Sequence, residues 1–274
     1  MPSKLLFTTL QQLRAYLYRR AAGKGIGKKF PILWKTYDKF YQLLVPQKTF
    51  LHEVGGNKIL IDLTEPDYRM RRILEDYTSL TEYEPATSNL VRSILREGDT
   101  VLDIGASIGP FSLTMSKLVG ETGRIYAFEP TEMCFNYLCE NIKINNCKNI
   151  YPYKLGAWDK DELIRAQLAT KRPIWANGIR LDDFLAQHGV EKVDFIKMDI
   201  DGAEPWALRG LMRTFEKNPH LKMVMEYYPL YIRRFGGDPE EVLDIVRKYF
   251  DYKPIEGDYG DGYWNFYCVR KPIM

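Results

Sequence analysis

Residues 100–110 read TVLDIGASIGP, a short apolar run that passes directly into a glycine-containing turn. The run predicts a strand over Thr100–Ile104, and the apolar segment after the turn predicts a helix over Phe111–Val119. Gly105 and Gly109 allow a tight turn and let a ligand approach the backbone closely. A strand, a glycine turn and a helix in this order predict a βαβ unit with a ligand site at the turn.

The same alternation continues along the chain and predicts an α/β fold with a doubly wound, mostly parallel sheet. Further strands are expected at Arg124–Phe128, 149–154, 193–199, 222–225 and 264–269, helices at 132–145 and Pro239–Tyr249, and an earlier hairpin at 49–63. Ligands of such sheets bind outside the carboxyl ends of the strands, near the point where the strand order reverses. Residues that follow the strands are therefore the candidates for function.

The glycine turn favours one nucleoside cofactor over another. A dinucleotide site prefers G-x-G-x-x-G, which seats a pyrophosphate on the helix, but Ser107 stands at the second glycine position. S-adenosylmethionine has no pyrophosphate, and Asp103 is placed to meet its amino group or to hold the turn amides. Glu129 lies twenty residues beyond Gly109, at the distance of a ribose-binding acid. The alternatives are a plain strand–helix turn and a surface acid that precedes a helix.

Four acids follow the predicted fourth and fifth strands and should meet at one edge of the sheet. We predict as catalytic residues Asp199, Asp201, Glu204 and Glu226. A hydroxyl that accepts a methyl group needs its proton removed by a base or its oxygen held on a metal. Asp199, Asp201 and Glu226 are accordingly a candidate Mg²⁺ site. Lys197 shares the face of Asp199, and it is expected in a neutralising ion pair or at the substrate.

Aromatic and basic residues near the end of the chain are candidates for an acceptor pocket. The aromatic stretch 227–231 and the glycine-rich loop 257–262, with Tyr263 and Trp264, offer ring faces that suit sugars. Arg233 and Arg234 suit anionic groups. Ordinary packing of these aromatic side chains is the alternative.

Several segments of the chain resemble the FkbM-type methyltransferase family. They are YEP at 83–85, GRIYAFEP at 123–130, RLDDF at 180–184 and VDFIKMDIDGAE at 193–204. The resemblance covers roughly residues 49–270 and implies a class I methyltransferase, Rossmann-like fold with a seven-stranded sheet whose last strand runs antiparallel. It also implies O-methylation of a hydroxyl of a sugar, a glycan or a natural product.

By position, the resemblance implies a set of cofactor contacts along the carboxyl edge. These are Glu84, Asp103, Gly105, Ala106, Ser107, Gly109, Glu129, Pro130, Gly156, Ala157 and Asp199. Glu84 is expected at the methionine end of the cofactor. Gly156 and Ala157 are expected beside the adenine, with Trp158 either stacked there or in the core.

Residues 1–48 lie outside the resemblance and are strongly basic. Ten Lys and Arg against one acid give +9, and the remainder carries 29 basic and 35 acidic residues, or −6, which together make +3. We therefore predict a basic, aromatic helical extension over 1–48 and a methyltransferase domain over 49–274. An amphipathic helix within 1–24 is expected to contact an anionic membrane surface, or to pack on its own domain or on a second subunit.

Composition limits the remaining classes of protein. The chain has 45% hydrophobic and 27% charged residues, with no apolar stretch of membrane-spanning length and no signal peptide pattern. Four cysteines without CxxC pairs or histidine partners fit a cytoplasmic protein. A nucleic-acid methyltransferase would explain the basic extension, but the clustered acids would repel phosphates. A non-catalytic scaffold that retains the fold is the other alternative.

Overall fold

The computed structural model describes residues 49–64, 77, 81–167, 174–256 and 264–272. These residues fall into two units: 49–54, 58–64, 77 and 81 in the first, and 55–57 with everything from Glu82 onward in the second. The hairpin thus groups apart from the predicted domain 49–274, except for its turn. The predicted extension 1–48, its helix within 1–24 and the acceptor loop 257–263 lie outside the described residues.

The hairpin has the predicted strands. β1 (Thr49–Val54) and β2 (Asn57–Asp62) form a two-stranded sheet. Alternate residues of the second strand are buried, as in a strand with one packed face.

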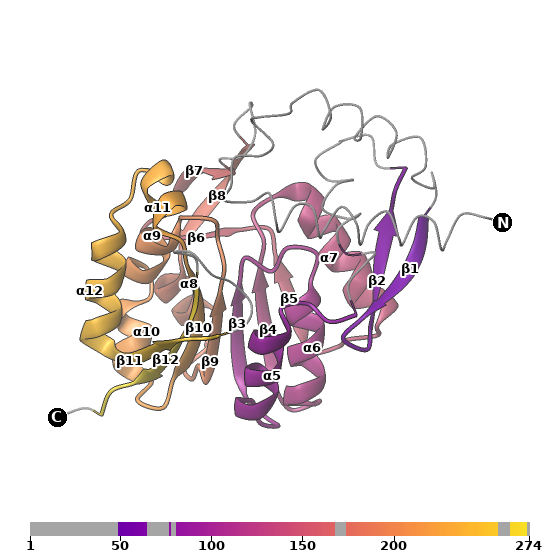
Figure 1. Cartoon of the computed structure of the whole chain (residues 1–274), viewed down its shortest axis with the longest axis horizontal. Helices are drawn as coiled ribbons and strands as arrows, with labels where there is room; N and C mark the ends of the chain where they lie inside the picture. Colours follow the sequence, from indigo (N-terminus) through magenta and orange to yellow (C-terminus); the bar gives the residue numbers. More distant parts are fainter. Residues whose placement is uncertain (1–48, 65–76, 78–80, 168–173, 257–263, 273–274) are drawn as a thin grey trace. The chain divides into compact units, whose positions relative to one another are not determined.

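A seven-stranded sheet forms the centre of the second unit (Figure 1). Its strands in spatial order are β11 (Phe250–Pro254), β12 (Trp264–Arg270), β10 (Lys222–Tyr227), β9 (Phe195–Met198), β3 (Thr100–Ile104), β4 (Arg124–Phe128) and β5 (Ile150–Tyr153). All neighbours from β10 to β5 are parallel, whereas β12 runs antiparallel to both β10 and β11. The predicted α/β fold, with seven strands and an antiparallel last strand, is confirmed. The strand order reverses between β3 and β9, which makes their carboxyl ends the expected ligand site.

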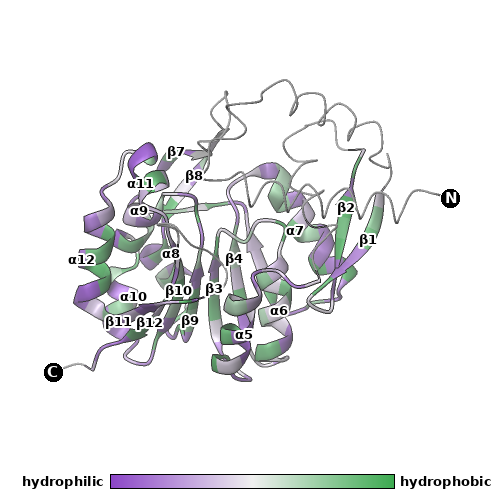
Figure 2. Ribbon diagram, viewed as in Figure 1, coloured by the Kyte–Doolittle hydropathy of each residue, from purple (hydrophilic) through white to green (hydrophobic). Residues whose placement is uncertain are grey.

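The two faces of this sheet differ in chemistry. Even-numbered residues of β3, β4 and β9, such as Leu102 and Ile196, belong to the main apolar core. Side chains of five of the described helices contribute to that core: α8 (Leu181–Gln187), α9 (Glu204–Arg209), α10 (Met212–Lys217), α11 (Pro229–Phe235) and α12 (Pro239–Tyr249). Figure 2 shows green and purple bands along α12, as expected for a helix with one buried face.

The opposite face of the sheet carries charged residues. Asp103 of β3 and Lys197 of β9 are register partners on this face, and the Lys197 ammonium lies 4.9 Å from the ring centre of Phe111. Phe111 belongs to α6 (Pro110–Val119), which contacts α5 (Pro85–Ile94); α7 (Glu132–Ile144) follows β4. Among the described helices, none is long and apolar enough to cross a membrane.

A separate three-stranded sheet was not predicted. It consists of β6 (Gly156–Trp158), β8 (Ile174–Arg180) and β7 (Glu162–Gln167), in that order. Trp158 is buried there and stacks on Trp206, with ring centres 4.7 Å apart and planes within 2°. Its indole N–H donates to Glu162 at 2.7 Å. The structure therefore places Trp158 in the core, which was one of the two expectations.

Candidate active site

The glycine turn after β3 is tied to the ends of both neighbouring strands. The carbonyl oxygen of Phe128 accepts hydrogen bonds from the amides of Gly105 and Ala106, at 2.9 and 3.0 Å. Gly105 has φ 83°, and a Cβ there would lie 1.9 Å from the carbonyl oxygen of Asp199. Only glycine fits this left-handed position so close to the backbone that follows β9. The turn and the loop after β9 therefore form one surface.

Glu129 is buried at the end of β4 and holds this turn in place. One of its carboxylate oxygens accepts from the Ser107 amide at 2.9 Å, and the other accepts from the Thr131 amide and hydroxyl at 2.9 and 2.5 Å. Burial raises the pKa of Glu129, although these hydrogen bonds oppose the change. A carboxylate has about four acceptor positions, so the oxygen facing Ser107 retains capacity for a further donor.

Lys197 and Asp199 form the ion pair expected from strand alternation. The Lys197 ammonium lies 2.7 Å from the Asp199 carboxylate, and the lysine is only 2% exposed. Burial alone would lower the pKa of Lys197, but the carboxylates of Asp199, Glu84 and Asp103 hold it above its ordinary value. These four charged groups therefore lie within electrostatic reach of one another.

Asp103 is a buried carboxyl beside the glycine turn. Burial raises its pKa to about 6, while Lys197 and a short hydrogen bond from the Ser112 hydroxyl oppose that shift. Its second oxygen, Oδ1, is buried and has no hydrogen-bond partner among the described residues. A buried carboxylate oxygen without a donor costs free energy, and an ammonium or hydroxyl of a ligand would satisfy it. Asp103 therefore fits the predicted contact with a cofactor amino group.

Glu84 reaches the same edge from the start of α5. Its backbone is left-handed, with φ 42°, and its side chain is buried. The side-chain amide of Asn265 donates to Glu84 at 2.9 Å. Asn265 was missed in the sequence because it lies in the last strand, opposite Glu226. The signal that could have found it is a lone amide between two aromatic residues of a predicted buried strand.

The loop between β9 and α9 separates the predicted catalytic acids. Asp201 is exposed to solvent, yet the surrounding protein and Asp199 raise its pKa to about 6, against Lys197. Glu204 is instead fully buried, and one of its oxygens accepts from the amides of Ile200 and Gly202, both at 3.3 Å. Burial raises the pKa of Glu204. Asp201 is therefore open to an acceptor, whereas Glu204 holds the loop.

The predicted Mg²⁺ site does not form. Within the described part of the chain, no three His, Cys, Asp or Glu side chains are grouped so that they could hold a metal ion. The physical reason is visible at Asp199, whose carboxylate already faces the Lys197 ammonium. Asp199, Asp201 and Glu226 therefore do not fit a metal ion.

The residues expected near the adenine lie around β6. Gly156 and Ala157 are both buried in this strand. A Cβ at Gly156 would lie 2.5 Å from the Ile164 side chain and 3.5 Å from Pro130, so Gly156 and Pro130 are neighbours. The structure thus joins the end of β4 to β6, as the predicted cofactor contacts require.

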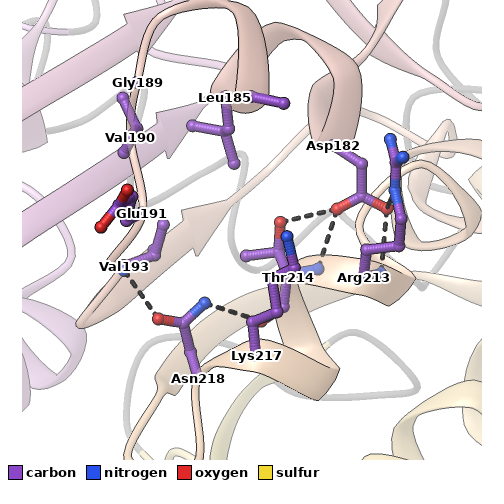
Figure 3. Close-up of a pocket in the computed structure, with 11 residues that line it drawn as sticks. Asp182, Leu185, Gly189, Val190, Glu191, Val193, Arg213, Thr214, Lys217 and Asn218 are labelled. Atoms are coloured by element: carbon purple, nitrogen blue, oxygen red, sulfur yellow. Dashed lines mark hydrogen bonds and ion pairs between the residues drawn. The ribbon is translucent and has the colours of Figure 1, made fainter.

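A pocket of about 420 Å³ lies at the opposite, amino end of β9 and β10 (Figure 3). Asp182 accepts there from the amides of Arg213 and Thr214, at 2.9 and 2.8 Å, and from the Thr214 hydroxyl. Asn218 bridges the Val193 amide and the Thr214 carbonyl, at 2.9 and 2.8 Å. These buried polar groups satisfy one another, so Asp182 joins α8 to α10 and marks no second cofactor site.

Comparison with known proteins identifies a family for the chain. The sequence model of the methyltransferase FkbM domain matches residues 103–254. An uncharacterised protein of Methanocaldococcus jannaschii is 26% identical over 194 residues, which cover 67% of this chain and 68% of the relative.

Two other relatives match over short segments only. The protein-L-isoaspartate O-methyltransferase of Methanosarcina mazei is 45% identical over 56 residues, 20% of this chain and 23% of that protein. The tRNA(Phe) (4-demethylwyosine(37)-C(7)) aminocarboxypropyltransferase of M. jannaschii is 37% identical over 59 residues, 22% of this chain and 23% of that protein. The chain thus spans about a quarter of the length of these two relatives.

A solved structure shares the fold, and a second is similar in part. A proposed rRNA methylase of Clostridium thermocellum superposes with a TM-score of 0.50 at 13% identity, over 68% of this chain and 96% of that one. An S-adenosylmethionine-dependent methyltransferase of Aquifex aeolicus has a TM-score of 0.43 at 22% identity, over 68% and 89% of the two chains. The family model covers more than half of the sequence, and the chain therefore belongs to the FkbM family of S-adenosylmethionine-dependent methyltransferases.

Proposed function

We propose that the protein transfers a methyl group from S-adenosylmethionine to a hydroxyl of a sugar, a glycan or another natural product. The observation that carries the proposal is Asp201, a solvent-exposed carboxylate beside the Lys197–Asp199 pair. A hydroxyl is a weak nucleophile until a base takes its proton, and a positioned base contributes about 10²–10⁴-fold. Asp201 is the accessible acid that can do this next to the cofactor edge.

The residues at that edge fit the cofactor. When bound, S-adenosylmethionine supplies a methyl group on a positively charged sulfur. Glu129 would accept hydrogen bonds from the ribose hydroxyls, and its bonds from the amides of Ser107 and Thr131 hold the carboxylate in place. The unpartnered oxygen of Asp103 suits the cofactor's amino group. The glycine turn excludes side-chain atoms where the cofactor would pass.

Asp201 is supported as the base by its surroundings. Its pKa of about 6 leaves it ionised at neutral pH but more basic than an ordinary aspartate. Its backbone is left-handed, with φ 52°, and Gly202 lies so close to α11 (Pro229–Phe235) that a Cβ would be 2.5 Å from the Tyr231 carbonyl oxygen. This close packing holds the Asp201 carboxylate on a fixed loop, as a positioned base requires.

Helix α11 is the proposed wall of the acceptor pocket. The rings of Tyr228 and Tyr231 are 4.4 Å apart, and the Arg234 guanidinium lies 5.8 Å from the Tyr231 ring. Burial and the nearby Asp201 carboxylate raise the pKa of Tyr231, so this tyrosine borders the proposed base. Aromatic faces with an exposed arginine suit a sugar ring that carries an anionic group.

The test is transfer of labelled methyl groups to neutral sugars, uronic acids and sugar phosphates. Base-stable product would identify a methyl ether rather than a methyl ester. Asp201→Asn should lower kcat about 10²-fold or more while binding S-adenosylhomocysteine like the wild type. Asp251→Asn, at an exposed aspartate of β11, is the matched control. Full turnover by Asp201→Asn would contradict the proposal.

A further inference from the structure

Asn265 brings a fully constrained amide to the edge of the sheet. It is 2% exposed, and its side-chain nitrogen donates to Glu84 at 2.9 Å and to the Thr87 hydroxyl at 3.0 Å. An ionised carboxylate can only accept, so the nitrogen of the amide must face Glu84. Both hydrogens of the amide are then in use, which fixes the Asn265 side chain in one orientation.

Glu84 is held in a conformation that its own helix does not explain. It occupies the N-cap of α5 with a left-handed φ of 42°, yet its side chain makes no cap hydrogen bond to that helix. A non-glycine residue is strained in this region, because its Cβ approaches the following carbonyl oxygen. Such strain persists where the surroundings over-determine the conformation, commonly at functional sites. Here a partner of the carboxylate, Asn265, lies 181 residues further along the chain.

Glu84 belongs to the charged group at the cofactor edge. Its carboxylate acts on the Lys197 ammonium together with those of Asp199 and Asp103. The buried Oδ1 of Asp103 has no hydrogen-bond partner among the described residues, and a buried carboxylate oxygen needs a donor. The amino-acid end of S-adenosylmethionine carries an ammonium, which would supply that donor beside Glu84.

We propose that Asn265 is a positioning residue that holds the Glu84 carboxylate to receive the α-amino group of S-adenosylmethionine. This inference rests on the proposed function and adds the means by which the methionine end is recognised. The Asn265 amide leaves the carboxylate charged and restrains its rotation. Without the amide, Glu84 loses a charge-assisted hydrogen bond that helps to set its direction.

The test compares two ligands that differ only at the recognised end. S-adenosylhomocysteine carries the amino-acid group, whereas 5′-methylthioadenosine keeps the adenosine and the thioether but lacks that group. In calorimetric titration, Asn265→Leu should lower the affinity for S-adenosylhomocysteine about tenfold or more, which is the effect of losing one charged hydrogen bond. Its affinity for methylthioadenosine should stay within about twofold of the wild type. In a Glu84→Gln background, Asn265→Leu should cause no further loss.

The control is Asn218→Leu, because Asn218 is a buried asparagine that bridges two elements at the amino end of the sheet. It should leave the ratio of the two affinities unchanged. If Asn265→Leu does not fold, Asn265→Asp has the same shape and takes its place. Equal losses for both ligands would show a general structural role and overturn the inference, as would unchanged S-adenosylhomocysteine binding. A wild type that binds neither ligand would instead overturn the proposed function.

Discussion

Lys197 and Asp199 leave the sheet on the same face, two residues apart, and their charged groups meet at 2.7 Å. The pair lies where β9 ends, so the buried ammonium faces the carboxylates of Glu84 and Asp103 as well. Lys197 is thus a positive charge that helps several acids to remain together at the cofactor edge.

Removal of the Lys197 charge should destabilise the fold. In Lys197→Met the carboxylates would remain buried without their counter-charge, which typically costs about 3–5 kcal/mol. Lys192→Met is the control, since Lys192 is 73% exposed and its pair with Asp194 should contribute less than about 1 kcal/mol. Urea unfolding measures both variants. Equal stabilities would show that Lys197 does not compensate the buried acids.

The raised pKa of Asp103 predicts a defined pH dependence of stability. The folded-state pKa of about 6 lies above the ordinary 3.8, so the folded protein binds the proton more tightly than the unfolded chain. The resulting stability is present at low pH and is lost as pH rises from about 4 to about 6. Asp103→Asn has no carboxyl group that titrates in this range. Its free energy of unfolding, relative to that of the wild type, should therefore rise by roughly 3 kcal/mol between pH 4 and 7. Urea unfolding measures this difference. If the difference in unfolding free energy between the variant and the wild type stayed constant across this range, the raised pKa of Asp103 would be contradicted.

Gly105 should tolerate no side chain. A Cβ there meets the Asp199 carbonyl oxygen at 1.9 Å, whereas Gly189, which also has a positive φ, has nothing within 4 Å. Gly189→Ala should therefore cost only the left-handed strain of about 1–2 kcal/mol. Gly105→Ala should cost clearly more and abolish S-adenosylhomocysteine binding. Thermal unfolding measures the stability of the two variants, and calorimetric titration measures their binding of S-adenosylhomocysteine. Similar losses of stability in both variants would contradict the close packing of the turn.

The contribution of Glu204 to stability and turnover should depend on the shape of its side chain rather than on its charge. Glu204→Gln keeps an oxygen for the amides of Ile200 and Gly202, and burial already favours the neutral carboxyl. Its turnover and stability at neutral pH should stay near those of the wild type. Glu204→Ala leaves both amides without their acceptor and should cost about 2–4 kcal/mol. Loss of turnover in a stable Glu204→Gln would instead support the prediction that Glu204 is catalytic.

The sheet was predictable wherever the pattern is local. Strands Thr100–Ile104 and Arg124–Phe128 and helix Pro239–Tyr249 have the predicted bounds. A buried parallel strand is a short apolar run between turn signals, and this helix starts at Asp238, which caps it by accepting from the Glu240 amide. Acids at the ends of such strands meet at one edge for topological reasons, which explains why the sequence could place Asp103, Glu129 and Asp199 at this edge.

Other features depend on distant partners and left no local signal. β6 has only three residues, and it pairs with β8, which lies beyond β7 in the chain. Helix α5 contains Thr87, Ser88 and Asn89, which favour turns over helix interiors, so its pattern did not predict a helix. Asn265 acquires its role only through Glu84. The role of Glu204 likewise follows from the loop fold, because spacing alone cannot separate a loop anchor from a base.

The most direct test of the central claim is calorimetric titration with S-adenosylhomocysteine of the wild type, Glu129→Ala and Glu132→Ala. Glu129 is buried against the glycine turn, whereas Glu132, three residues on, has a side chain that is 77% exposed. We predict micromolar binding to the wild type and to Glu132→Ala, and loss of binding in a folded Glu129→Ala. A wild type that does not bind the ligand, or a Glu129→Ala that binds it equally well, would contradict the placement of the cofactor at this edge of the sheet.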